Sequence, residues 1–303
     1  MPPRSTVADE IRRLALRLFD ARVTFGHGTD NAWDDAAALV LHAAGLPLES
    51  STEVYAKAVT ARVRERIRGL ARRRIRDRVP TPYLIGRTFF AGLPFKVDRR
   101  ALIPRSPIAE LIEARFRPWL APGRVRRILD IGTGGGCIAV ACARYFPRAR
   151  VVATDISTAA LALAAVNARA LRVRTRLRLR RADLFPAAGE GPFDLIVANP
   201  PYVGTREYAA LPLEYRREPA TALCSGRDGL DAVRRILARA RTFLTRAGIL
   251  IVEVGNSDRA LAKAFPRVPF LWLEFARGGG GVFLLTRAEL ERHAADFEGA
   301  LDD

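Results

Sequence analysis

The sequence predicts an α/β protein in which a small helical unit precedes a mostly parallel, doubly wound sheet. Apolar residues recur at helical spacing up to about residue 78, and Pro80 and Pro82 then end that pattern. From Arg127 onward, short apolar strands alternate with helical segments. We expect a helical N-terminal domain over residues 1–80, a β-hairpin linker over 81–104 and a Rossmann-like domain over 105–303.

Composition narrows the class of protein. Nearly half of the residues are apolar and 27% are charged, which is typical of a soluble globular chain. No apolar run approaches the roughly 20 residues that a membrane span requires, and the first residues lack the order of a secretory signal. We therefore expect a cytoplasmic protein with no membrane contact. The histidines, His27, His42 and His293, are scattered, so no metal is expected.

The formal charge of +18 is large, and a field of this sign attracts nucleic acid or ribonucleoprotein. Almost every cation is arginine, however, and the chain is also rich in alanine. Such a bias could equally reflect genome composition.

The N-terminal unit is expected to contain three helices, over residues 7–21, 32–44 and 53–78. Gly45 and Pro47 end the second helix. The third carries an apolar stripe surrounded by arginines. Beyond the prolines, residues 88–90 and 95–97 flank Ala91 and Gly92, which predicts a β-hairpin.

The C-terminal part should alternate strands and helices in βαβ order. The expected strands are residues 127–131, 151–154, 176–180, 195–198 and 249–254, and the expected helices are 137–146, 158–170 and 230–244. Two last apolar segments, 270–275 and 281–285, are separated by glycines and indicate a closing antiparallel pair.

A glycine-rich turn follows the first strand of this domain. Glycines here allow backbone dihedrals that a Cβ would forbid and let a ligand approach closely. Gly134, Gly136 and Ala139 also fit the dinucleotide pattern G-x-G-x-x-A, so a nicotinamide or flavin enzyme stays open, as does an ordinary turn. S-adenosylmethionine is favoured because Asp130 can meet the cofactor's ammonium group and the compact turn from Gly132 suits a ligand without pyrophosphate.

Carboxylates at the next strand ends extend this expected cofactor site. Asp155 can accept hydrogen bonds from both ribose hydroxyls, although it or Ser157 could instead cap the following helix. Asp183 can accept from the adenine amino group, with Leu184 beside the ring, and a turn or cap is its alternative. The expected cofactor-binding residues are Asp130, Gly132, Thr133, Gly134, Gly136, Asp155, Ile156, Asp183, Leu184 and Asn199.

The most specific sequence is Asn199-Pro200-Pro201-Tyr202, directly after an apolar strand. An amide or exocyclic amine is a poor nucleophile, because its lone pair is delocalised. The Asn199 side-chain oxygen and the Pro200 carbonyl can accept hydrogen bonds from the target NH₂ group. The two prolines, Pro200 and Pro201, stiffen the backbone that carries these acceptors, and Tyr202 can stack on the planar amide or base. We predict these four as catalytic residues that act by positioning, with a rigid turn as the alternative.

At this point the chain, from Tyr83 to Thr286, resembles the glutamine-N5 methyltransferases. The resemblance rests on the glycine turn, on Asn199–Tyr202 and on Leu102–Ile108. It implies a helical domain, a β-hairpin and a Rossmann-like domain that transfers a methyl group from S-adenosylmethionine to a glutamine amide nitrogen of a protein. It also makes Arg105 a substrate-binding candidate beside Asn199, Pro200 and Tyr202, whereas a surface arginine is the alternative.

Within that family, residues 104–108 look like the branch that modifies large-subunit ribosomal protein L-three. The release-factor branch typically carries Pro-Arg-Pro-Asp-Thr-Glu there. Residues 213–216, 253–257, 272–275 and 282–286 also agree with the ribosomal branch, whereas the first 80 residues match no motif.

The implied partner is a ribosomal protein, including within an assembling large subunit. The arginine-dense helix Arg62–Arg78 could then contact ribosomal RNA, or could be a solvated face. Three alternatives remain: a release-factor glutamine methyltransferase, an exocyclic-amine methyltransferase acting on ribosomal RNA, and a non-catalytic ribosome assembly factor.

Overall fold

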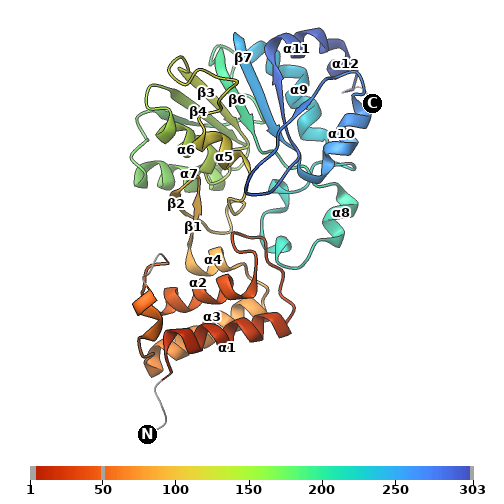
Figure 1. Cartoon of the computed structure of the whole chain (residues 1–303). Helices are drawn as coiled ribbons and strands as arrows, with labels where there is room; N and C mark the ends of the chain where they lie inside the picture. Colours follow the sequence, from red (N-terminus) through yellow and green to blue (C-terminus); the bar gives the residue numbers. More distant parts are fainter. Residues whose placement is uncertain (1–4, 49–51, 301–303) are drawn as a thin grey trace. The chain divides into compact units, whose positions relative to one another are not determined.

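The computed structural model describes residues 5–48 and 52–300, and these form two compact units (Figure 1). One unit comprises residues 1–88, 97–99 and 212–217, and the other comprises 89–96, 100–211 and 218–303, as far as these are described. The division into 1–80, 81–104 and 105–303 stays a prediction, because the units are defined by packing and not by independent folding. The described residues leave out 1–4 and 49–51 of the first predicted domain and 301–303 of the last.

The first unit packs short helices around one apolar core. Its elements are α1 (Val7–Asp20), α2 (Ala32–Ala44), the 3₁₀ helix η1 (Thr52–Ala56), α3 (Ala61–Ile75) and α4 (Thr81–Ile85). The single helix expected over 53–78 is wrong, because η1 and α3 are separate. The hydroxyl of Thr60 accepts a hydrogen bond from the backbone N–H of Val63, and this N-cap begins a new helix.

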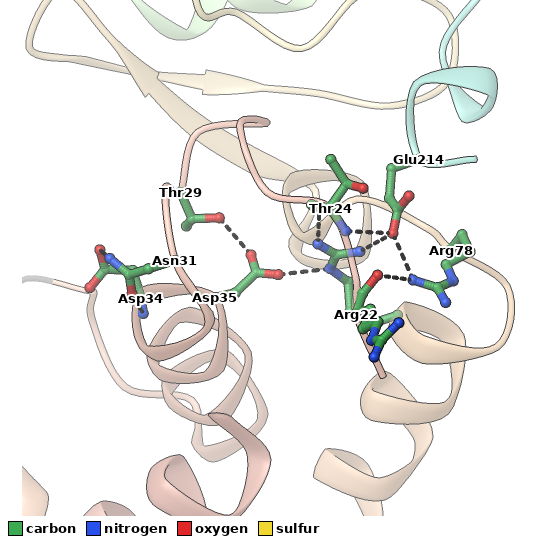
Figure 2. Close-up of polar contacts among 9 residues, drawn as sticks. Arg22, Thr24, Thr29, Asn31, Asp34, Asp35, Arg78 and Glu214 are labelled. Carbon is green, nitrogen blue, oxygen red and sulfur yellow. Dashed lines mark hydrogen bonds and ion pairs between the residues drawn. The ribbon is translucent and has the colours of Figure 1, made fainter. Parts of the chain in front are cut away.

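A buried ion cluster lies inside the first unit (Figure 2). The Arg74 side chain is 2% exposed, and its Nε donates to Asp35 at 2.7 Å. Its other nitrogens donate to the Thr24 carbonyl at 2.7 Å and to Glu214 at 3.3 Å. Glu214 also accepts from the Thr24 N–H at 3.0 Å and from Arg78 at 3.3 Å. The cluster therefore binds residues 212–217, which come late in the sequence, into the helical unit.

The predicted hairpin is confirmed as β1 (Arg87–Phe90) and β2 (Leu93–Lys96). Ala91 and Gly92 both have positive φ, at 47° and 68°. Two successive positive φ angles match the right-handed twist of the paired strands, which explains why glycine stands in the second position.

The main sheet has seven strands in the order β5-β4-β3-β6-β7-β9-β8. The strands are β3 (Arg127–Ile131), β4 (Arg150–Asp155), β5 (Leu177–Arg181), β6 (Phe193–Ala198), β7 (Leu244–Glu253), β8 (Leu271–Trp272) and β9 (Val282–Thr286). β9 runs antiparallel to both β7 and β8, and β3 to β7 pair in parallel. The closing antiparallel pair is thus confirmed, with β8 much shorter than the predicted segment.

Helices cover both faces of this sheet (Figure 1). One core lies under α5 (Ile108–Glu113), α6 (Cys137–Tyr145) and α7 (Thr158–Ala170), and the other lies under α9 (Asp231–Phe243), α10 (Asp258–Ala264), α11 (Arg287–Arg292) and α12 (Ala294–Gly299). Ile128 enters the first core and its neighbour Leu129 the second, as alternation along a strand requires. Shorter elements are α8 (Thr205–Ala210), η2 (Tyr215–Arg217), η3 (Ala220–Ala222) and η4 (Gly255–Ser257).

The strand order reverses between β3 and β6, which lie side by side in parallel. The chain proceeds from β3 through β4 to β5 on one side and from β6 to β7 on the other. Ile131 pairs with Ala198, so Gly132 and Asn199 are the next residues along the two strands. Such a switch point opens a crevice at the carboxyl ends of the strands, where α/β sheets bind ligands. Among the helices described, none is long and apolar enough to cross a membrane.

Candidate active site

A cavity of about 360 Å³ lies at this switch point, within the second unit. Its volume falls in the range of small-molecule sites. The lining comes from the glycine turn, from the ends of β4, β5 and β6, from the segment before α5, and from residues around η3 and the start of α9. The predicted site residues in the lining are Gly132, Thr133, Gly134, Asp155, Ile156, Asp183, Leu184, Asn199, Pro201 and Arg105.

The glycine turn is shaped by positive φ angles. Gly132, Gly134 and Gly136 have φ of 69°, 54° and 82°. Gly136 does not line the cavity and instead begins α6, where an added Cβ would lie 2.9 Å from the Cβ of Ala164 in α7. Glycine at this position therefore lets α6 and α7 pack closely together, and the close packing holds the turn that precedes α6 and lines the cavity.

Asp130 is fully buried at the end of β3 and does not line the cavity. One carboxylate oxygen accepts hydrogen bonds from the Thr133 hydroxyl at 2.6 Å and from the Ala139 N–H at 3.0 Å. Within the described part of the chain, no donor reaches the other oxygen. Burial raises the pKa of Asp130 to about 7, against the lowering effect of these two hydrogen bonds. A buried oxygen without a donor suits a cationic ligand group such as an ammonium.

Asp155 braces the turn from β4. One of its oxygens accepts from the Gly134 N–H and the other from the Ser157 N–H, each at 2.8 Å. Ser157 caps α7 through a bond from Ala160, so Asp155 is not needed as that cap. Its neighbour Ile156 is 61% exposed while lining the cavity, which leaves an apolar surface beside the carboxylate.

Asp183 and Leu184 lie at the end of β5. Both oxygens of Asp183 accept hydrogen bonds from the guanidinium of Arg235 in α9, at 3.2 and 2.7 Å. Leu184 has a positive φ of 65°. Both residues line the cavity. Their assignment to adenine stays a prediction, and Arg235 is a further charged group at that position.

The Asn-Pro-Pro-Tyr motif begins beside the glycine turn. A Cβ built on Gly132 would lie 3.9 Å from the Asn199 carbonyl oxygen and equally far from the Pro200 Cα. Asn199 and Pro201 line the cavity, whereas Pro200 is buried and Tyr202 is half-buried outside the lining. The hydroxyl of Tyr202 donates to Glu253 at 3.1 Å.

Arg105 is not a free surface arginine. Its guanidinium donates to both oxygens of Glu218, at 2.8 and 2.7 Å, and the Glu218 side chain is fully buried. Glu218 also accepts from the Ile103 N–H at 2.8 Å. This pairing holds the segment before α5 against the cavity, because a bidentate arginine–carboxylate pair fixes orientation as well as distance.

Sequence reasoning missed Glu218, Glu253, Ser106 and Arg235. Glu253 could have been found, because it is a charged residue that ends an apolar strand at the edge where ligands bind. Glu218 lies in an irregular segment, and no pattern marks it.

Comparison with known proteins defines the class first. Residues 117–212 match the methyltransferase small domain family. The catalytic domain of hMettl16, solved in complex with a hairpin of the MAT2A 3′UTR, superposes with a TM-score of 0.52 at 17% identity, covering 78% of this chain and 85% of that one. The fold is that of an S-adenosylmethionine-dependent methyltransferase.

The family follows from closer relatives. The ribosomal protein uL3 glutamine methyltransferase of Xanthomonas campestris pv. campestris is 48% identical over 96% of this chain and 94% of its own length. The protein of the same name from Bordetella pertussis is 44% identical over 94% of this chain and 96% of its own. This chain belongs to the family of ribosomal protein uL3 glutamine methyltransferases.

S-adenosylmethionine fits the residues present. Gly132, Gly134 and Gly135 line the cavity and have no side chain, so the turn presents backbone there. The buried Asp130 oxygen without a donor lies outside the lining, two residues before the first glycine of this turn. The Asp155 carboxylate and the exposed Ile156 side chain offer a polar and an apolar contact for a nucleoside. No cluster of three potential metal ligands occurs in residues 5–48 and 52–300.

Proposed function

We propose that this enzyme methylates the side-chain amide nitrogen of a glutamine in ribosomal protein uL3. The observation that carries the proposal is the convergence of Asn199 and the glycine turn on one cavity, in a chain 48% identical to a uL3 glutamine methyltransferase. We also propose that it works in the cytoplasm, where ribosomal proteins are made.

The chain's own residues have to position the amide. We assign the Asn199 side-chain oxygen and the Pro200 carbonyl as acceptors for the two N–H groups, which fixes the amide plane so that the nitrogen lone pair, perpendicular to that plane, points toward the cavity. Two consecutive prolines keep both acceptors in place before substrate arrives. We assign stacking on the amide plane to Tyr202. When bound, the cofactor would supply the methyl group from a positively charged sulfur: the carbon–sulfur bond breaks with its electron pair staying on sulfur, a carbon–nitrogen bond forms, and the proton displaced from the amide nitrogen passes to solvent.

The cofactor assignment follows the order of the strand ends. Asp130 and the turn Gly132, Thr133, Gly134 and Gly136 would hold the amino-acid part, and Asp155 the ribose. Ile156, Asp183 and Leu184 would surround the base. Arg105 is proposed to contact the protein substrate through the part of its guanidinium that faces the cavity.

The decisive experiment uses uL3 purified from cells that lack this enzyme. The protein is incubated with uL3 and cofactor carrying a labelled methyl group, and the product is digested and sequenced by mass spectrometry. We expect the label on one glutamine. Label found only on a release factor or on ribosomal RNA would contradict uL3 as the substrate. If no methyl group is transferred to any of the three, the remaining alternative is a non-catalytic ribosome assembly factor.

The variant Asn199→Ala separates catalysis from binding in the same assay. Loss of one preorganised polar contact of this kind costs on the order of 100-fold in turnover. We expect that loss with cofactor affinity nearly intact. Unchanged transfer by Asn199→Ala would exclude the proposed amide contact.

We further propose that the helix region Arg62–Arg78 contacts ribosomal RNA in an assembling large subunit. The arginines at 62, 64, 66, 68, 72, 73 and 76 are exposed, whereas Arg74 belongs to the buried ion cluster. Exposed cations in this number attract phosphate without reading sequence. Such a contact with ribosomal RNA would hold the positively charged enzyme near a positively charged protein substrate.

A further inference from the structure

We propose that Glu253 is a positioning residue for methyl transfer, which holds the ring of Tyr202 in the orientation that the amide requires. The inference rests on the proposed function of the Asn-Pro-Pro-Tyr motif and assigns a residue outside that motif to the same reaction.

The sheet itself brings Glu253 to the motif. Val252 pairs with Ala198 across the parallel strands β7 and β6, so Glu253 and Asn199 are the next residues along the two strands. Glu253 is the last residue of β7, after the apolar run Ile249–Val252, and it is 5% exposed. A carboxylate buried at this depth is unfavourable unless donors satisfy it.

Two hydroxyl groups supply those donors. One oxygen of Glu253 accepts from Tyr202 at 3.1 Å, and the other accepts a short hydrogen bond from Ser106, in the segment before α5. The Ser106 oxygen in turn accepts from the Ile108 N–H at 3.2 Å, so its own proton is directed to Glu253. Burial raises the pKa of Glu253, and the bonds from Ser106 and Tyr202 and the charge of Arg105 oppose that rise.

Both donors need an acceptor, which explains a carboxylate in preference to an amide. A glutamine at this position would have nearly the same size but only one oxygen. Its NH₂ group would face either Tyr202 or Ser106, each of which donates in the present arrangement. A glutamine therefore leaves no cavity but replaces one of the two bonds to a carboxylate by a neutral bond of reversed direction, in which that hydroxyl accepts from the NH₂ group.

The residues after Glu253 confine the ring from other directions. A Cβ on Gly255 would lie 2.5 Å from Cε2 of Tyr202, so the ring packs directly against this glycine's backbone. The Ser257 hydroxyl donates to the Tyr202 carbonyl at 2.9 Å. Tyr202 is thus fixed in three places: Glu253 binds its hydroxyl, Gly255 packs along one edge of its ring, and Ser257 binds its backbone carbonyl. We assign a face of this half-buried ring, whose neighbour Pro201 lines the cavity, to the planar amide, and a ring fixed in advance loses no rotational freedom on binding.

The test is a double-mutant cycle on the full chain, with Tyr202→Phe, Glu253→Gln and both changes together. Tyr202→Phe removes only the hydroxyl and leaves the ring. We expect each single variant to lower kcat for uL3 methylation about tenfold, because the ring loses its fixed orientation. KM for uL3 and the cofactor Kd should change less than about threefold, since remote contacts dominate both.

The double variant distinguishes a positioning role of Glu253 from a merely structural one. If Glu253 acts through Tyr202, adding Glu253→Gln to Tyr202→Phe lowers kcat little further, so the double variant is also about tenfold slower than wild type. A merely structural Glu253 would give multiplied effects, about 100-fold in all, together with a weaker cofactor Kd. That result, or unchanged kcat in Tyr202→Phe, overturns the positioning role.

The control is Glu298→Gln, which removes a half-exposed carboxylate paired with Arg241 far along the chain. It should leave kcat unchanged.

The wild-type measurement separates the proposed function from the proposed role of Glu253. If wild type transfers no methyl group to uL3, the proposed function fails and the role of Glu253 fails with it. If wild type is active and the cycle is multiplicative, only the role of Glu253 fails.

Discussion

The hydroxyl of Thr133 donates a 2.6 Å hydrogen bond to Asp130, at the start of the turn that lines the cavity. The bond leaves the second Asp130 oxygen without a donor among the described residues, and burial raises the pKa of this carboxyl to about 7. Below that pH the carboxyl is protonated in the free enzyme, whereas an ammonium group beside it favours the charged form.

Cofactor binding should therefore release a proton from Asp130. At about pH 6 most molecules carry that proton, so binding releases about one proton, and the number falls as pH rises through 7. Affinity should rise with pH over the same interval and then level off. Calorimetry in two buffers of different ionisation enthalpy measures the release. Asp130→Asn should abolish it, and a release that does not vary with pH would argue against this contact.

Gly136→Ala should destabilise the second unit and weaken cofactor binding. The new Cβ would lie 2.9 Å from Ala164 and would sit on a backbone with φ of 82°. A strained site of this kind costs about 1–3 kcal/mol of unfolding free energy. Thermal unfolding with and without cofactor measures both effects.

Gly69→Ala is the matched control for that substitution. Gly69 lies inside α3 and an added Cβ would meet nothing within 4 Å. The change should stabilise the protein by about 0.5–1 kcal/mol, because it removes backbone freedom from the unfolded chain. Equal effects of the two substitutions would mean that the α6–α7 contact does not limit stability.

Glu214→Gln should weaken the helical unit. Burial alone would raise the pKa of Glu214, but the hydrogen bond from Thr24 and the charge of Arg74 hold it below its usual value. Removing one partner of a buried ion pair costs about 3 kcal/mol, although Arg74 keeps Asp35. Denaturant unfolding of the full chain at neutral pH measures the loss.

The pH dependence has a defined sign. Because the folded pKa lies below the unfolded value, the stabilisation by Glu214 is present above the ordinary pKa of 4.5 and is lost as pH falls through the folded one. The difference between wild type and Glu214→Gln should therefore shrink in acid. Glu65→Gln, which removes an exposed partner of Arg68, should show little difference at any pH. A constant gap for Glu214→Gln would contradict the ion-pair assignment.

Replacing Arg62, Arg73 and Arg76 with glutamine should weaken binding to ribosomal RNA hairpins. Each lost phosphate contact reduces the slope of log affinity against log salt by about 0.7–0.9, so the triple variant should lose about two to three. Titration at several salt concentrations measures this slope. The control removes the same charge from exposed Arg144, Arg148 and Arg174 of the other unit. Equal losses in the two variants would indicate a general effect of net charge.

Much of the fold was predictable because it is encoded locally. The strand Arg127–Ile131 and the helix Thr158–Ala170 begin and end where periodicity places them. The turn at Gly132 and the motif at Asn199 come together because both follow parallel strands that are neighbours at the switch point.

What was not predictable depends on partners far along the chain. Arg74 looks like one more arginine of a basic helix, yet it is buried by Asp35 and Glu214, 39 and 140 residues away. Glu218 pairs with Arg105 across 113 residues. Neither pairing leaves a periodic signal, because a single long-range contact obeys no repeat.

The assignment of residues 212–217 to the helical unit has a consequence for biosynthesis. The N-terminal helices leave the ribosome first, but Arg74 can meet Glu214 only after the chain has been made through β6 and α8. Until then one of its buried donors must remain hydrated or find a substitute. These helices are thus completed only after Glu214 has been made, and a version of the gene that ends before residue 214 would encode helices with an incomplete interior.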